Sequence, residues 1–120
     1  MLNVTVAKVG EVIVVGCEGR IVQRESACKL REAVTSQTDA RIVVLELSEV
    51  RTIGGGGLGM LVSLQRWARE RNIRFLLFHP SQSVQNKLKR ARSIARFYIT
   101  SLEEMRVLLA YANSRYGLAA

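Results

Sequence analysis

The sequence predicts an α/β protein with a largely parallel sheet. Short segments rich in Val, Ile and Leu alternate with longer segments whose apolar residues lie three and four positions apart, which is typical of strands alternating with helices. Residues 41–47 (RIVVLEL) and 73–78 (IRFLLF) are mostly apolar runs, as expected for strands buried on both faces. A length of 120 residues fits one domain, and we expect residues 1–120 to form it, with a core from about 4 to 113.

Local signals place the individual elements. Gly10 and Glu11 separate the first two strands and favour a tight hairpin. Ser101 and Glu104 form a capping box, in which each side chain accepts a hydrogen bond from the other residue's free backbone N–H, and this box opens the last helix. The predicted strands are 4–6, 12–15, 41–47, 73–78 and 97–99, and the predicted helices are about 24–36, the glycine run to 70, 83–92 and 101–113.

Cysteine usage and hydropathy indicate the compartment. Cys17 and Cys28 match no metal or redox spacing, and we interpret both as small buried apolar residues rather than as a disulfide. No basic segment precedes the first apolar run, and no apolar run approaches the ~18–20 residues that span a bilayer. We therefore expect a cytoplasmic protein without a transmembrane segment.

The net charge of +8 comes from the second half of the chain. Residues 1–60 hold seven Lys or Arg and seven Asp or Glu, whereas residues 61–120 hold eleven and three. This asymmetry suggests an acidic partner, although basic residues spread over solvated helix faces would give the same count. The basic segment 86–96 (NKLKRARSIAR) lacks interleaved aromatic residues, so we expect no specific nucleic acid. Solvated helix faces are the simpler interpretation of these charges, and among partners an acidic protein surface is favoured over a nucleic acid.

Four consecutive glycines, at positions 54–57, are the most unusual feature of the sequence. Each ordered glycine costs about 0.5–1 kcal/mol relative to alanine, so the run indicates backbone that takes positive φ or approaches another group closely. It joins a predicted buried strand to a predicted helix start, where free N–H groups and the helix dipole favour an anion.

The glycines do not predict a nucleotide site. Gly54, Gly56 and Gly59 fit the pattern G-x-G-x-x-G, but that motif follows its strand immediately, and residues 48–53 are predicted to intervene. The motif also needs an acid at the end of the next strand, and no Asp or Glu occurs between positions 70 and 103.

Residues 44–64 (VLELSEVRTIGGGGLGMLVSL) resemble the signature of STAS domains, the anti-sigma factor antagonist family. In that family an apolar strand and an acid-containing turn lead to [ILV]-Asp-Ser-Ser-Gly-Leu-Gly at the start of a helix. Gly57-Leu58-Gly59 matches the end of this motif, and residues 18–22 (EGRIV) resemble the family's Gly-x-[ILV]-Asp segment. The resemblance covers nearly the whole chain. It implies a mixed sheet of four or five strands with about four helices in a single flanking layer.

The departures from the family pattern concern phosphorylation. In such antagonists a partner kinase, which doubles as the anti-sigma factor, phosphorylates the second Ser of Asp-Ser-Ser-Gly. The resemblance places Gly56 at that position, with Gly54 and Gly55 before it and Gly57 after it. Val22 replaces the aspartate of the earlier segment. Because glycine has no hydroxyl, we expect no phosphorylation at Gly56.

Two nearby hydroxyls do not replace the missing acceptor. We interpret Thr52 as a turn residue and Ser63 as a helix-face residue. The resemblance then implies an antagonist that holds an anti-sigma factor or kinase-type regulator without phosphate control. Two alternatives stay open, a STAS subunit of a transporter or scaffold complex and a weak nucleotide- or anion-binding STAS domain.

We expect a binding protein without catalytic residues, cofactor or metal. His79 precedes Pro80 at a strand end with no carboxylate or nucleophile pair nearby, so we interpret it as a surface turn residue. We interpret Trp67 as the edge of the core, with partner contact as the alternative. The predicted partner-binding residues are Gly54, Gly55, Gly56, Gly57, Leu58, Gly59, Arg20, Val22 and Gln23.

Overall fold

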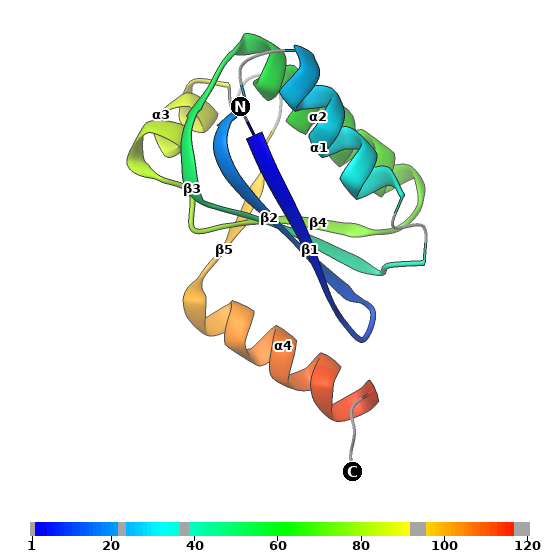
Figure 1. Cartoon of the computed structure of the whole chain (residues 1–120). Helices are drawn as coiled ribbons and strands as arrows, with labels where there is room; N and C mark the ends of the chain where they lie inside the picture. Colours follow the sequence, from blue (N-terminus) through cyan, green and yellow to red (C-terminus); the bar gives the residue numbers. More distant parts are fainter. Residues whose placement is uncertain (1, 22–23, 37–38, 92–95, 117–120) are drawn as a thin grey trace.

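Five strands form one sheet, in the order β1-β2-β3-β4-β5. The computed structural model describes residues 2–21, 24–36, 39–91 and 96–116, without the side chains of residues 24, 25 and 113–116. Strand β1 runs antiparallel to β2, and the other neighbouring strands are parallel (Figure 1). This confirms the predicted α/β class and the mixed sheet. Along the described chain the elements are β1 (Leu2–Val9), β2 (Val12–Ile21), α1 (Arg24–Thr35), β3 (Ile42–Ile53), α2 (Gly55–Glu70), β4 (Arg74–Phe78), α3 (Gln82–Arg90), β5 (Tyr98–Thr100) and α4 (Leu102–Tyr116).

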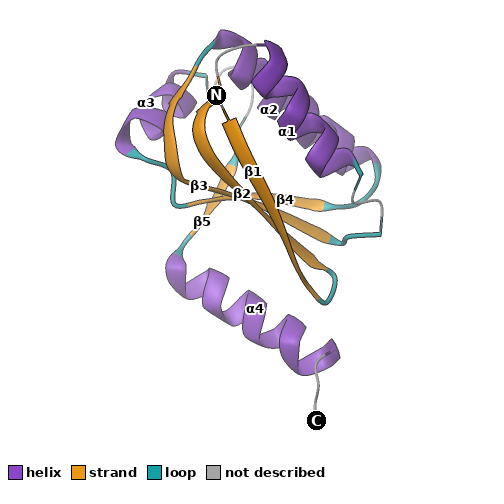
Figure 2. Cartoon of the chain, in the orientation of Figure 1, coloured by secondary structure: helices purple, strands orange, loops and turns teal. Residues whose placement is uncertain are grey.

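Helices cover both faces of the sheet (Figure 2). On one face, Leu30 of α1, Leu61 of α2 and Leu88 of α3 share a core with Leu45 of β3. On the opposite face α4 buries a smaller cluster, which consists of Met105, Ala112, Val12, Val44 and Leu76. The single flanking layer expected from the sequence therefore describes α1–α3 only. Within the described residues no helix is both long and apolar enough to cross a membrane.

Strand β3 is longer than the sequence predicts. It continues to Ile53, which pairs with Ile21 at the end of an equally extended β2. Register shifts between these strands interrupt the alternation of buried and exposed residues. At one of them the Glu46 carboxylate accepts hydrogen bonds from the backbone N–H of Ser48, at 2.6 Å, and from its hydroxyl, at 2.8 Å. The prediction that the strand ends at residue 47 and that residues 48–53 intervene before the glycines was wrong, because the register shifts break the alternation by which a strand is recognised.

The two cysteines lie in different environments. Cys17 on β2 is buried, and burial, with a smaller contribution from Glu46, raises the pKa of its thiol to about 12. Cys28 on α1 is exposed, so its predicted burial was wrong. The neighbouring Ala27 and Leu30 face the sheet, which turns Cys28 outwards. Both thiols are free, as predicted.

Candidate functional site at the start of α2

The glycine run forms the start of a helix. Gly54 is the N-cap, with extended backbone at φ −85°, and α2 begins at Gly55. The Gly54 N–H donates to the carbonyl of Ile21 at 3.0 Å, and its own carbonyl accepts from the Leu58 N–H at 2.9 Å. Among the described glycines, those with positive φ are Gly10 and Gly19, and neither belongs to the glycine run. Positive φ therefore does not explain the run, and close approach is the reason that is left.

Close approach explains one of these glycines directly. A Cβ atom at Gly57 would lie 2.1 Å from the carbonyl oxygen of Ile21 and 2.8 Å from its Cγ2. Gly57 is therefore where the end of β2 packs against the first turn of α2. Gly55 and Gly59 are exposed, and among the described residues no atom outside the local helix lies within 4 Å of such a Cβ. The chain thus needs glycine at Gly57 for packing, whereas no packing contact with the described part of the chain requires it at Gly55 or Gly59.

The start of α2 is electropositive. The helix has no side-chain hydrogen bond at its N-cap and no acidic residue in its first turn, so the partial positive charge of its free N–H groups is not neutralised there. Lys87 on α3 adds a full charge, because its Nζ donates to the carbonyl of Ile53 at 2.7 Å. Ile53 immediately precedes Gly54, so a cation lies beside the helix start.

Lys87 was missed as a site residue by the sequence analysis, which counted it within an exposed basic segment. Val84 and Leu88 form the buried face of α3, and Lys87 lies three residues after the first and directly before the second. Such spacing places a long side chain on the inward side of its helix, where its stem packs and its amine reaches a polar group. That spacing is the signal that could have identified it.

Several predicted site residues come together here. Arg20 is exposed near the end of β2, one residue before Ile21, which contacts both Gly54 and Gly57. Gly55, Gly56 and Gly59 are exposed, Gly54 and Leu58 are half-buried, and Gly57 is buried. Val22 and Gln23 lie outside the described residues.

Neither of the two alternative hydroxyls belongs to the first turn of α2. Thr52 is half-buried within β3, opposite Arg20, rather than in a turn as predicted. Ser63 is exposed on α2, as predicted, well inside the helix. Neither side chain lies at the position of Gly56.

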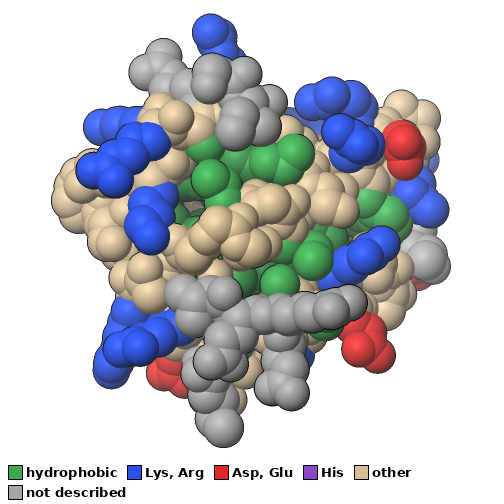
Figure 3. All heavy atoms as spheres, turned by 90° about the horizontal axis from the view of Figure 1, so that it is seen from above, with side chains coloured by type: hydrophobic (Ala, Val, Ile, Leu, Met, Phe, Trp, Pro, Cys, Tyr) green, Lys and Arg blue, Asp and Glu red, His purple; other side chains and the backbone are tan. Residues whose placement is uncertain are grey.

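The surface around the site is mixed apolar and basic. Viewed from above, towards the end of the molecule that carries the start of α2, hydrophobic side chains and backbone lie in the middle, with Lys and Arg side chains around them (Figure 3). Trp67, further along α2, is half-buried against the main core, which agrees with its interpretation as a core-edge residue. The Arg71 guanidinium lies over the indole ring of Trp67, 5.0 Å from the centre of that ring.

The structure removes one of the two arguments against a nucleotide site. Because β3 reaches Ile53, the strand does lead directly into the glycines. The acid that a dinucleotide site needs at the end of the next strand is still missing, since β4 ends at Phe78 and is followed by the exposed His79, at φ 57°. Among the described residues there is also no group of three His, Cys, Asp or Glu side chains that could hold a metal ion.

Comparison with known proteins identifies the family. The STAS domain profile matches residues 3–104, and the chain therefore belongs to the STAS domain family. A search of curated proteins finds no match. Among solved structures, an anti-sigma factor antagonist from Mycobacterium paratuberculosis superposes with a TM-score of 0.70 at 17% identity, covering 92% of this chain and 95% of that one.

Two further structures share the fold. The Bacillus cell fate determinant SpoIIAA in its phosphorylated form has a TM-score of 0.70 at 11% identity, covering 91% of this chain and 99% of that one. A putative anti-sigma factor antagonist from Thermotoga maritima has a TM-score of 0.67 at 19% identity, covering 89% and 94%. The chain is thus a STAS module with the fold of the anti-sigma factor antagonists.

Proposed function

We propose that this chain is a non-catalytic protein-interaction module that binds an anti-sigma factor or kinase-type regulator without phosphorylation control. The observation that carries the proposal is the exposed, hydroxyl-free Gly56 in the first turn of α2. The STAS resemblance places the phosphorylated serine at this position. A phosphate would add about −1.5 to −2 charges at the helix start, and the side chain that would accept it is absent.

The proposed docking surface depends on bare backbone. With no side chains at Gly55, Gly56 and Gly59, a partner can approach the first turns of α2 closely, and half-buried Leu58 offers an apolar contact. Gly57 contributes indirectly, by letting β2 pack beneath the turn. We assign the surface to Gly54, Gly55, Gly56, Gly57, Leu58, Gly59, Arg20, Val22 and Gln23.

The charge of this surface favours an acidic partner. The start of α2 carries no acid to offset its dipole, and Lys87 lies beside it. Exposed Arg20 shares a hollow with Glu18, Glu49 and Arg51 and adds no net charge there, so the excess comes from the helix start and Lys87. Complementary charge accelerates encounter and fixes orientation more than it raises affinity. We therefore propose an acidic surface on the bound regulator.

A charge placed in the first turn of α2 tests the surface. The Gly56→Glu variant puts a bulky anion where close approach is needed, while an acid at a helix N-terminus does not destabilise the helix. We expect the dissociation constant for the regulator to rise about tenfold or more. Ser63→Glu is the matched control, since Ser63 is also exposed on α2 but lies outside the surface, and its affinity is expected to be unchanged.

Circular dichroism first checks that both variants are folded. Calorimetric titration of the regulator into wild type and into each variant then measures the dissociation constants. Equal affinities for Gly56→Glu and wild type would contradict the proposed surface. Recovery of a transporter or scaffold complex in pull-downs, in place of an anti-sigma factor or kinase, would favour the first alternative. A rise in melting temperature with ATP or GTP would favour the anion-binding alternative.

A further inference from the structure

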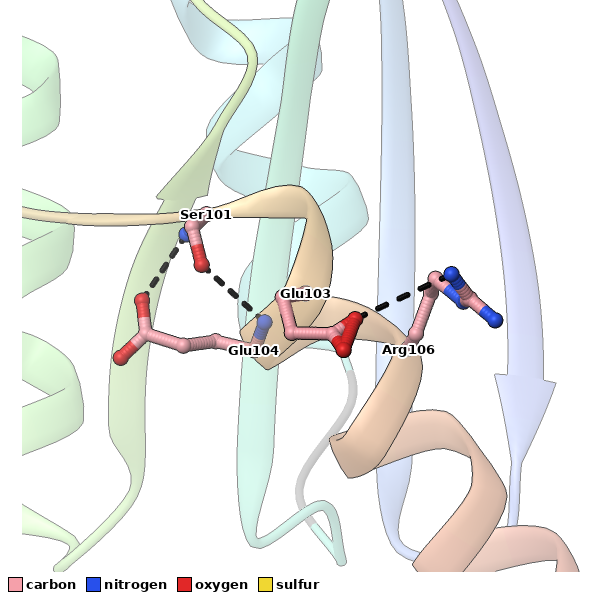
Figure 4. Close-up of polar contacts among 4 residues, drawn as sticks. All are labelled: Ser101, Glu103, Glu104 and Arg106. Atoms are coloured by element: carbon pink, nitrogen blue, oxygen red, sulfur yellow. Dashed lines mark hydrogen bonds and ion pairs between the residues drawn. The ribbon is translucent and has the colours of Figure 1, made fainter.

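Helix α4 stands apart from the other helices. It begins at the predicted capping box, where the Glu104 N–H donates to the Ser101 hydroxyl at 3.0 Å and the Ser101 N–H donates to the Glu104 carboxylate at 2.9 Å (Figure 4). It is the described helix that covers the sheet face opposite α1–α3. Met105 and Ala112 are buried there, with Leu108 and Leu109 partly buried beside them.

A groove runs along one side of α4. Two hollows, of about 340 and 320 Å³, lie between the helix and the strands, and both are lined by Leu108, so they adjoin at that residue. We call them together the α4 groove. Its apolar lining includes Leu76, Tyr98, Val107, Leu108, Tyr111 and Ile42.

Exposed apolar side chains concentrate on β5 and α4, and three of them, Tyr98, Val107 and Tyr111, line the α4 groove. Among the described residues the exposed large hydrophobics are Val6 on β1 and, on β5 and α4, Tyr98, Ile99, Leu102, Val107 and Tyr111. Val107 and Tyr111 are each 63% exposed and lie four residues apart, on the same side of the helix. Both side chains line the groove, and together they form an apolar ridge along its edge. Exposed apolar surface gathered in this way marks an interaction site.

The charge around the α4 groove is close to balanced. Its lining contains Glu11, Arg41, Arg74, Glu103 and Glu104. Arg41 and Glu11 form an ion pair at 3.3 Å, and Glu103 pairs with Arg106 at 3.8 Å. The chain as a whole carries +8. Copies of so basic a protein repel one another, and this face largely lacks the excess charge that causes the repulsion.

We propose that the α4 groove is the interface of a homodimer, in which the Val107–Tyr111 ridge of each copy packs into the groove of the other. A two-fold interface uses the same patch on both copies, so a ridge and a groove lying side by side satisfy each other reciprocally. The near-neutral charge favours a second copy over an acidic partner. This proposal does not depend on the proposed function. Such a dimer leaves the start of α2 exposed in both copies, because α2 belongs to the opposite helical layer.

Sedimentation velocity of the purified chain, from micromolar to near-millimolar concentration, tests the proposal. Wild type is expected to pass from the 13.4 kDa monomer to a dimer, more readily at higher salt because salt screens the remaining repulsion. Val107→Asp and Val107→Arg are each expected to raise the dimer dissociation constant about tenfold or more, since either charge would be buried unpaired. Leu102→Asp is the control, because Leu102 is 65% exposed on the same helix but does not line the groove.

Three outcomes would overturn the proposal. Wild type that remains monomeric over the whole range leaves the groove without a second copy. A dimer equally weakened by Leu102→Asp and by the Val107 variants is not held by the ridge. If Val6→Lys abolishes the dimer while the Val107 variants keep it, the two copies pair through the open edge of β1 and not through the α4 groove.

Discussion

Individual glycines at the start of α2 have different roles. Gly57 lies against the carbonyl of Ile21, so a methyl group there meets backbone that cannot move without shifting β2. Gly59 is exposed in the same helix, and a Cβ there would meet no atom of the described residues within 4 Å beyond the helix itself. The sequence alone showed that the run was costly and that close approach was one reason for it. It could not show which glycine the packing required, because that depends on the position of β2.

Alanine substitutions separate these roles. Gly57→Ala is expected to lower the free energy of unfolding by about 1–3 kcal/mol, because the added Cβ overpacks the contact with β2. Gly59→Ala is expected to raise it by about 0.5–1 kcal/mol, because alanine is the better helix former at an exposed position. Chemical denaturation of the two variants and the wild type measures both effects. Equal changes in the two variants would show that the contact at Ile21 carries no energy.

At the level of elements, the sequence predicted the order of strands and helices and missed features that depend on pairing. The apolar run at residues 41–47 correctly indicated a strand buried on both faces, since Val43 and Val44 enter opposite cores. The segment from Ser48 to Ile53 was not predicted as part of the strand, because the register shifts break the alternation by which strands are recognised. The position of α4 on the opposite face was also missed, because local spacing does not determine which face a helix covers.

The cap of α4 predicts a pH dependence. Hydrogen bonds from the Tyr98 hydroxyl and from Ser101 hold the pKa of the Glu104 carboxyl below its ordinary value. Because the folded-state pKa lies below the unfolded-state one, the stabilisation is fully present above the ordinary pKa and is lost as pH falls through the folded-state pKa. The difference in free energy of unfolding between wild type and Glu104→Gln is therefore expected to shrink as pH falls below about 4.3, the ordinary Glu pKa.

Denaturant unfolding of the two proteins from neutral to acidic pH, with far-ultraviolet circular dichroism as the signal, measures this difference. A gap between wild type and Glu104→Gln that is independent of pH would show that the capping carboxylate does not contribute through its charge.

Across the whole molecule, the sheet separates two different surfaces. One carries the electropositive start of α2, and the other carries the near-neutral, apolar α4 groove. On the proposals above, this division would allow the chain to bind a regulator at α2 while it associates with a second copy at α4. A dimer would then present two α2 surfaces, and a partner with two matching sites would bind it with the gain in apparent affinity that bivalency gives.

Docking without a chemical switch is the central claim, and incubation of the chain with its regulator and ATP tests it most directly. Intact-mass spectrometry and a binding titration are made before and after the incubation, with Gly56→Ser as the positive control. The account predicts no mass change and no change in affinity for wild type, whereas Gly56→Ser gains one phosphate and binds more weakly. A phosphate on wild type at Thr52 or Ser63, together with an ATP-dependent loss of binding, would contradict the account.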